Sequence, residues 1–131
     1  MTGGDRGLSS PAGMDFSPDG NLFLADQIDE RILIYFPTPP TANFEAPTSF
    51  VGVFDPYISG GYGTALNELH NPSDVKYDYV SNKLWVADTS NARVSRYSHI
   101  LPVVNNSIGV DVDLQFQARA PNVWVYPKGM I

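Results

Sequence analysis

One order of short segments occurs twice in the chain, and this internal repeat limits the possible folds more than any other feature. The copies span residues 11–35 and 72–97. In each, a segment led by proline precedes a polar turn, a hydrophobic segment ending in Ala-Asp, a short polar loop, and a segment that begins with Arg and includes a Tyr. Such recurrence indicates a repeat protein, in which each unit buries its hydrophobic face against its neighbours.

Each unit is predicted to form an antiparallel β-meander. Ser17-Pro18-Asp19-Gly20 has Pro at the second and Gly at the fourth position of a type I turn, between β-forming residues. Residues 27–30 and 89–92 are expected to form the next hairpin loops. Further strands are predicted at residues 50–54 and 108–117, the latter because apolar and polar residues alternate along it. No run of ten or more residues carries a sustained helical apolar stripe, so we predict an all-β chain.

The repeated residues resemble the NHL repeat. The resemblance rests on residues 11–16, 21–26 and 31–35 and on their second copies, in which Asn91-Ala92-Arg93 matches the Asn-x-Arg element of the repeat. The first copy departs here, with Asp29-Glu30-Arg31 in that place. The resemblance implies β-propeller blades, each an antiparallel four-stranded meander, in a parent ring of six blades. The long spacer between the copies is similar to that of bacterial, often exported, members, which favours a secreted or extracytoplasmic location without identifying the compartment.

The resemblance divides the chain into repeat units. Repeat 1 is expected over about residues 8–54, a spacer loop over 55–70, and repeat 2 over about 71–117. A third copy is expected to start in about residues 122–131, where Pro127-Lys128-Gly129-Met130 repeats the opening of the first. We therefore expect a fragment of a propeller, which needs further blades from a longer chain or from self-association, because two isolated blades leave open edges.

Composition excludes several classes of partner and chemistry. With 14 acidic and 8 basic residues the formal net charge is -6, so nucleic acid is not an expected partner. No apolar run is long enough to span a membrane. The chain has no cysteine, and its two histidines, His70 and His99, do not have the spacing of metal ligands. No nucleophile elbow or phosphate-binding glycine loop occurs, so we predict no catalytic residue, metal or cofactor.

Four charged residues recur at equivalent positions and are predicted to build the repeat. Asp26 precedes the loop that leads to Arg31, and Asp88 precedes the loop that leads to Arg93. Each Asp is expected to accept loop amide hydrogens and to pair with its Arg. A residue that builds a blade recurs in every unit, whereas an active-site residue needs to occur once, so a structural role is favoured.

Loop residues are the candidates for ligand contact, because loops are exposed. These binding candidates are Tyr57, Tyr62, Gln27, Asp29 and Asn91. Trp85, which replaces Phe23 of the first copy, is instead expected to pack between blades.

The resemblance implies a non-enzymatic binding or scaffold module for a protein, peptide or glycan. The alternative is a fragment of a metal-dependent hydrolase or lyase, because the segment that begins at Pro11 is similar to one in gluconolactonase-like propellers. That family places a metal-binding Asn beside the first proline, where this chain has Ala12 and, in the second copy, Ser73. The missing ligand makes the enzyme the less favoured hypothesis. A structural fragment without activity of its own is the third.

Overall fold

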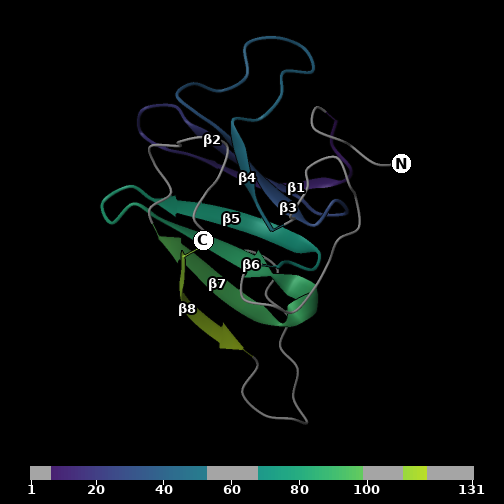
Figure 1. The fold of residues 1–131 in the computed structure, drawn as a ribbon, viewed down its shortest axis with the longest axis vertical. Helices are drawn as coiled ribbons and strands as arrows, with labels where there is room; N and C mark the ends of the chain where they lie inside the picture. Colours follow the sequence, from purple (N-terminus) through teal and green to yellow (C-terminus); the bar gives the residue numbers. More distant parts are fainter. Residues whose placement is uncertain (1–6, 53–67, 99–110, 118–131) are drawn as a thin grey trace.

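The structure is a computed structural model that describes residues 7–52 and 68–98 and the backbone of residues 111–117. It contains two four-stranded antiparallel sheets, each with its strands in sequence order (Figure 1). The first sheet comprises β1 (Pro11–Phe16), β2 (Leu22–Asp26), β3 (Arg31–Tyr35) and β4 (Ser49–Val51), and the second comprises β5 (Pro72–Asp78), β6 (Lys83–Asp88), β7 (Arg93–Ser98) and β8 (Asp111–Gln117). The prediction of an all-β chain built from antiparallel meanders is therefore confirmed.

The helical content of the described residues is one short turn. This is the 3-10 helix η1 (Thr89–Asn91), in the loop between β6 and β7. Within the described ranges, no helix has the length and apolar character needed to cross a membrane.

The predicted turn in the first copy is confirmed. The backbone N–H of Gly20 donates to the carbonyl of Ser17 over 2.9 Å, and Gly20 adopts a φ of 91°, a left-handed conformation that suits glycine. The Ser17 hydroxyl oxygen also accepts the backbone N–H of Asn21 at 3.0 Å. In the second copy the turn is fastened differently, because the Asp78 carboxylate accepts the backbone N–H of Val80 at 3.1 Å.

One predicted strand has different bounds in the structure, and a second is confirmed over its described residues. The strand predicted at residues 50–54 is Ser49–Val51, and Gly52 makes only an isolated bridge to Glu68. Gly52 has a φ of 112°, and a Cβ at this position would lie 2.6 Å from the Glu30 carbonyl oxygen, so the extended strand ends there. The strand predicted at 108–117 is confirmed over Asp111–Gln117. Residues 53–54 and 108–110, like the side chains of β8, lie outside the described part of the chain.

The main core lies between the two sheets. One face of the first sheet, at β1 and β2, packs on β5 of the second (Figure 1). Phe23 and Tyr77 stack across this interface with ring centroids 4.6 Å apart and an angle of 21° between the rings. The buried members of the cluster are Phe23, Ala25, Ile32, Ile34, Val51, Leu69, Val75, Leu84, Val86 and Tyr97. Each large side chain buried here contributes about 1.5–3 kcal/mol to folding.

The sheets approach closely because β1 carries a glycine at the interface. A Cβ on Gly13 would lie 2.2 Å from Oδ1 and 2.8 Å from Cα of Asp74, so no larger residue fits without displacing β5. On its opposite face the first sheet carries a second apolar cluster, made of Leu22, Leu24, Leu33 and Tyr35 with the partly buried Phe50. The first sheet is thus apolar on both faces, which is typical of an inner layer rather than of a sheet with one wet side.

Candidate functional site

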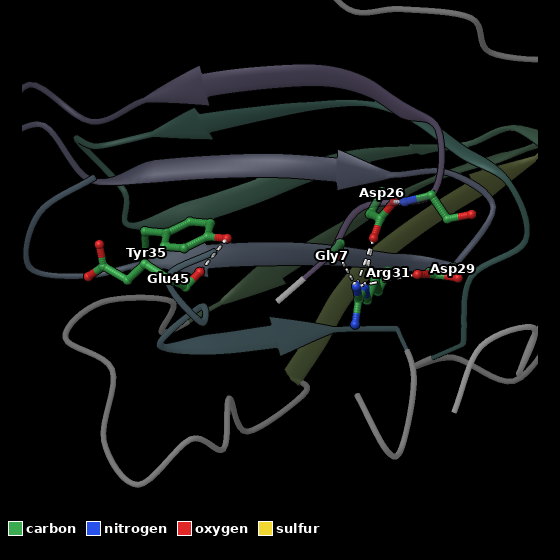
Figure 2. A network of polar contacts seen from close by, with 7 residues as sticks. Gly7, Asp26, Asp29, Arg31, Tyr35 and Glu45 are labelled. Atoms are coloured by element: carbon green, nitrogen blue, oxygen red, sulfur yellow. Dashed lines mark hydrogen bonds and ion pairs between the residues drawn. The ribbon is translucent and has the colours of Figure 1, made fainter. Parts of the chain in front are cut away.

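A buried ion pair fastens the end of the first sheet. Arg31 donates from Nε to Oδ2 of Asp26 over 3.0 Å, and its Nη2 lies 2.9 Å from the same oxygen (Figure 2). Nη2 also donates to the carbonyl of Gly7 over 2.9 Å, and Oδ1 of Asp26 accepts the backbone N–H of Ser9 at 2.7 Å. Both charged side chains are almost fully buried. The pair therefore ties the segment before β1 to the loop between β2 and β3.

The second copy repeats the main contacts of this arrangement. Arg93 donates from Nε to Oδ2 of Asp88 over 2.7 Å and from Nη2 to the carbonyl of Glu68 over 2.6 Å. Oδ1 of Asp88 accepts the backbone N–H of His70 at 2.7 Å. The structure thus brings together both pairs that the sequence singled out, Asp26 with Arg31 and Asp88 with Arg93.

The accepted amides are not those of the following loop, which corrects the expectation. In the first copy the loop amides of Gln27 and Ile28 donate to the carbonyls of Ser10 and Ser9, each over 3.0 Å. With the loop amides occupied in this way, the Asp26 carboxylate accepts the N–H of Ser9 instead. Burial raises the pKa of Asp26, although the Ser9 N–H and Arg31 both stabilise its charged form.

The loop between β2 and β3 is linked to the second sheet through Glu30. The Glu30 carboxylate accepts the backbone N–H of Asn71, and the Asn71 side chain in turn donates from Nδ2 to the Ser90 hydroxyl over 2.8 Å. Glu30 is 5 % exposed, and burial raises its pKa, opposed by the Asn71 N–H and by His70. This chain of hydrogen bonds sets the loop of residues 27–30 beside η1 at one end of the two sheets.

Glu30 is not among the residues predicted from the sequence to form a site, although a signal for it exists. Glu30 and Ala92 hold equivalent places, one residue before Arg31 and Arg93, and both have left-handed backbones with φ of 61° and 51°. A left-handed residue other than glycine is uncommon, and a charged residue that replaces alanine there departs from the repeat. Comparison of the two copies therefore marks Glu30 as a position with an additional task.

Around this linkage lies an exposed surface that we call the loop-end surface. Its members are Gln27, Ile28, Asn71, Ser90 and Asn91. Ile28 is 54 % exposed, Ser90 is exposed, and the other three are half-buried. This surface combines amide and hydroxyl side chains with one exposed apolar side chain, and such groups can form hydrogen bonds and a hydrophobic contact with a ligand.

The predicted ligand contacts have different environments. Gln27 and Asn91 are half-buried on the loop-end surface, and Nδ2 of Asn91 donates to Asp88 over 2.9 Å. Asp29 is 2 % exposed, so its expected exposure is wrong, because Arg31 draws its Oδ2 inward to 3.4 Å from Nη2 (Figure 2). Tyr57 and Tyr62 lie outside the described residues.

The positions compared with the lactonase metal ligand carry short side chains. Ala12 is exposed, and Ser73 shares a hydrogen bond between its hydroxyl and that of Thr89. Among residues 7–52 and 68–98, no three His, Asp or Glu side chains converge in a group suited to a metal ion.

Two antiparallel four-stranded meanders, each fastened by the same buried Asp–Arg pair, define an all-β repeat protein. Residues 69–97, which cover β5, β6, η1 and nearly all of β7, match the family model of the NHL repeat. The chain therefore carries an NHL repeat in its second sheet, and the resemblance seen in the sequence is confirmed there. No curated protein sequence matches the chain.

Proposed function

We propose that the two sheets are blades of a β-propeller, with six blades in the complete ring, and that the chain is a non-enzymatic binding module. Its ligand is a protein, a peptide or a glycan, held at the loop-end surface. The blades correspond to repeat 1 over about residues 8–54 and repeat 2 over about 71–117, with a third repeat starting in 122–131. The NHL match supports this proposal, because NHL repeats build propeller-type modules that commonly bind proteins.

A single contrast between the two copies carries the proposal. The residues that the copies share, an Asp and an Arg in each, are buried in the ion pairs that fasten each sheet. The residues between them differ, because Gln27-Ile28 of the first copy is replaced by Thr89-Ser90 in the second. A constant scaffold that presents varied loop residues is the usual construction of a recognition surface, whereas a catalytic site needs fixed chemistry.

The test uses a displayed random-peptide library and a glycan array as probes. The wild-type chain is screened first, and the binders are then measured against Ile28→Ser and Ser90→Arg. Because both side chains are exposed, these changes leave the core intact and should weaken binding at least tenfold.

The matched control is Val80→Ser, in the turn between β5 and β6, where Val80 is 82 % exposed. It removes an exposed apolar side chain far along the strands from η1, so binding should be unchanged. Absence of any binder, or an equal loss in the control and the loop-end variants, would refute the proposed function.

A further inference from the structure

The first sheet has an apolar face that turns away from the second sheet and is open at β1. Gly13 and Asp15 of this strand contact the second sheet, and Met14 and Phe16 alternate with them. Met14 pairs with Leu24 and Phe16 pairs with Leu22, so these residues continue the second apolar cluster. Met14 is 57 % exposed and Phe16 is 51 % exposed.

In the second copy the same face is covered. Val75 and Tyr77 hold the places of Met14 and Phe16, and Val75 is fully buried. Tyr77 stacks on Phe23 and donates its backbone N–H to Oδ2 of Asp15 over 2.8 Å. The face of the first sheet that carries Phe23 covers these residues of the second sheet. One repeat face is thus buried in the second sheet and open in the first.

The covering face of the first sheet also has a counterpart in the second sheet, on the side that no described residue of the first sheet covers. In the second sheet, Trp85 and Val94 hold the places of Phe23 and Ile32 on the side away from the first sheet. Trp85 is half-buried, and the Arg96 guanidinium lies 5.2 Å from its ring centroid. Among the described residues, the chain therefore uses one pair of complementary faces internally and presents a second pair of the same two kinds, one at each end of the stack.

We propose that the outward face of the second sheet, at Trp85 and Val94, packs on the outward face of the first sheet, at Met14 and Phe16, of a second copy of this chain. Trp85 then stacks on Phe16 of the second copy, as Phe23 stacks on Tyr77 within the chain. The contact is heterologous, since it joins two different faces, and its repetition generates a ring or a longer array. The inference rests on the proposal that the sheets are propeller blades.

A second copy is the favoured occupant because both stacking positions hold aromatic residues and the internal contact shows how they fit. Two elements of that contact are not repeated. Asp74 stands at the place of Gly13, so the two copies cannot approach at this strand as closely as the two sheets of one chain do. Lys76 stands at the place of Asp15, and a lysine side chain offers no acceptor for the backbone N–H of Phe16. The contact between copies is therefore expected to be weaker than the internal one, and to depend on protein concentration.

The experiment measures the mass of the full chain by light scattering across a concentration series. The wild-type chain should exceed 14.4 kDa and should grow with concentration. Phe16→Ser disables the receiving face and Trp85→Ser disables the covering face, so each variant alone should be monomeric. Far-ultraviolet circular dichroism checks that both remain folded, and Tyr79→Ser, an exposed aromatic on neither face, should keep the wild-type mass.

A mixture of the two variants separates this contact from nonspecific association. Each variant retains the face that the other has lost, so an equimolar mixture should give a heterodimer of twice 14.4 kDa and nothing larger. A monomeric wild type, or a mixture that stays monomeric, overturns the inference. Probe binding by a chain that does not self-associate would refute this inference alone. Self-association without any probe binding would refute only the proposed function.

Discussion

The carboxylate of Asp15 accepts the backbone N–H of Tyr77 over 2.8 Å, and this hydrogen bond joins β1 of the first sheet to β5 of the second. Tyr77 also stacks on Phe23, the cross-strand neighbour of Asp15, so the polar and the aromatic contact act at the same place. The relative position of the two sheets is therefore fixed by a directional hydrogen bond as well as by the burial of apolar side chains.

Replacing Asp15 with Ala should lower the free energy of unfolding by about 1–2 kcal/mol, because the N–H of Tyr77 loses a charged acceptor in a half-buried place. Asp15→Asn retains an oxygen at this position and should lose less. Urea unfolding of the three proteins measures the difference. An Asp15→Ala variant as stable as the wild type would mean that water replaces the carboxylate without cost.

Breaking the buried pair of the second sheet should have a larger effect. Arg93→Met leaves Asp88 buried without its cation, which costs about 3–5 kcal/mol. Lys76→Met removes a cation from a half-buried place and should change stability by about 0.5 kcal/mol or less. The two variants can be compared by thermal unfolding at one protein concentration. Similar stability of the two would show that the pair contributes nothing beyond a surface charge.

Glu30 makes the stability of the chain depend on pH in a defined direction. Burial raises its pKa above the ordinary 4.5, so the folded state holds this proton more tightly than the unfolded state does. Its favourable contribution is complete below pH 4.5 and disappears as the pH rises through the raised pKa of the folded protein.

Glu30→Gln removes this titration and retains an oxygen for the N–H of Asn71. The difference in unfolding free energy between the wild type and this variant should fall as the pH rises from about 4 to about 7, since only the wild type must bury a charge. Asp26, whose pKa is also raised, titrates in both proteins and cancels in the difference. A difference that does not vary with pH would contradict the assignment.

Gly13→Ala should destabilise the chain by about 1–3 kcal/mol, because the added Cβ meets backbone and side-chain atoms of Asp74. Ala12→Ser, at an exposed position of the same strand, is the control and should have little effect. Urea unfolding measures the two effects. If the dependence of the unfolding free energy on urea concentration is the same for all three proteins, the midpoints can be compared directly. A Gly13→Ala variant with the wild-type midpoint would mean that β5 shifts freely.

The sheets could be predicted because their signals are local. A strand is recognised by the alternation of adjacent residues, and the turn by the Pro and Gly within Ser17–Gly20. The recurrence of Asp and Arg at equivalent positions indicated the two ion pairs. The links between sheets could not be predicted. Asp15 and Glu30 bind backbone N–H groups of Tyr77 and Asn71, and every residue except proline has such a group.

Two side chains show why exposure is hard to predict. Asp29 was expected on the surface as a charged loop residue, but Arg31 lies inside and draws it inward. Trp85 was expected between blades because it replaces Phe23. Trp85 lies on the face of the second sheet that points away from the first sheet, so it does not pack in the interface between the two described sheets.

Each buried Asp–Arg pair binds the segment just before the first strand of its own sheet, through the carbonyl of Gly7 for Arg31 and that of Glu68 for Arg93. A gene duplication that copies one such segment therefore delivers a unit with its internal fastening complete. The hydrogen bonds of Asp15 and Glu30 reach into the adjoining copy and have to arise separately at each new junction. Duplication alone therefore supplies the fold of a new unit, whereas its attachment to the preceding unit requires further substitutions at the junction.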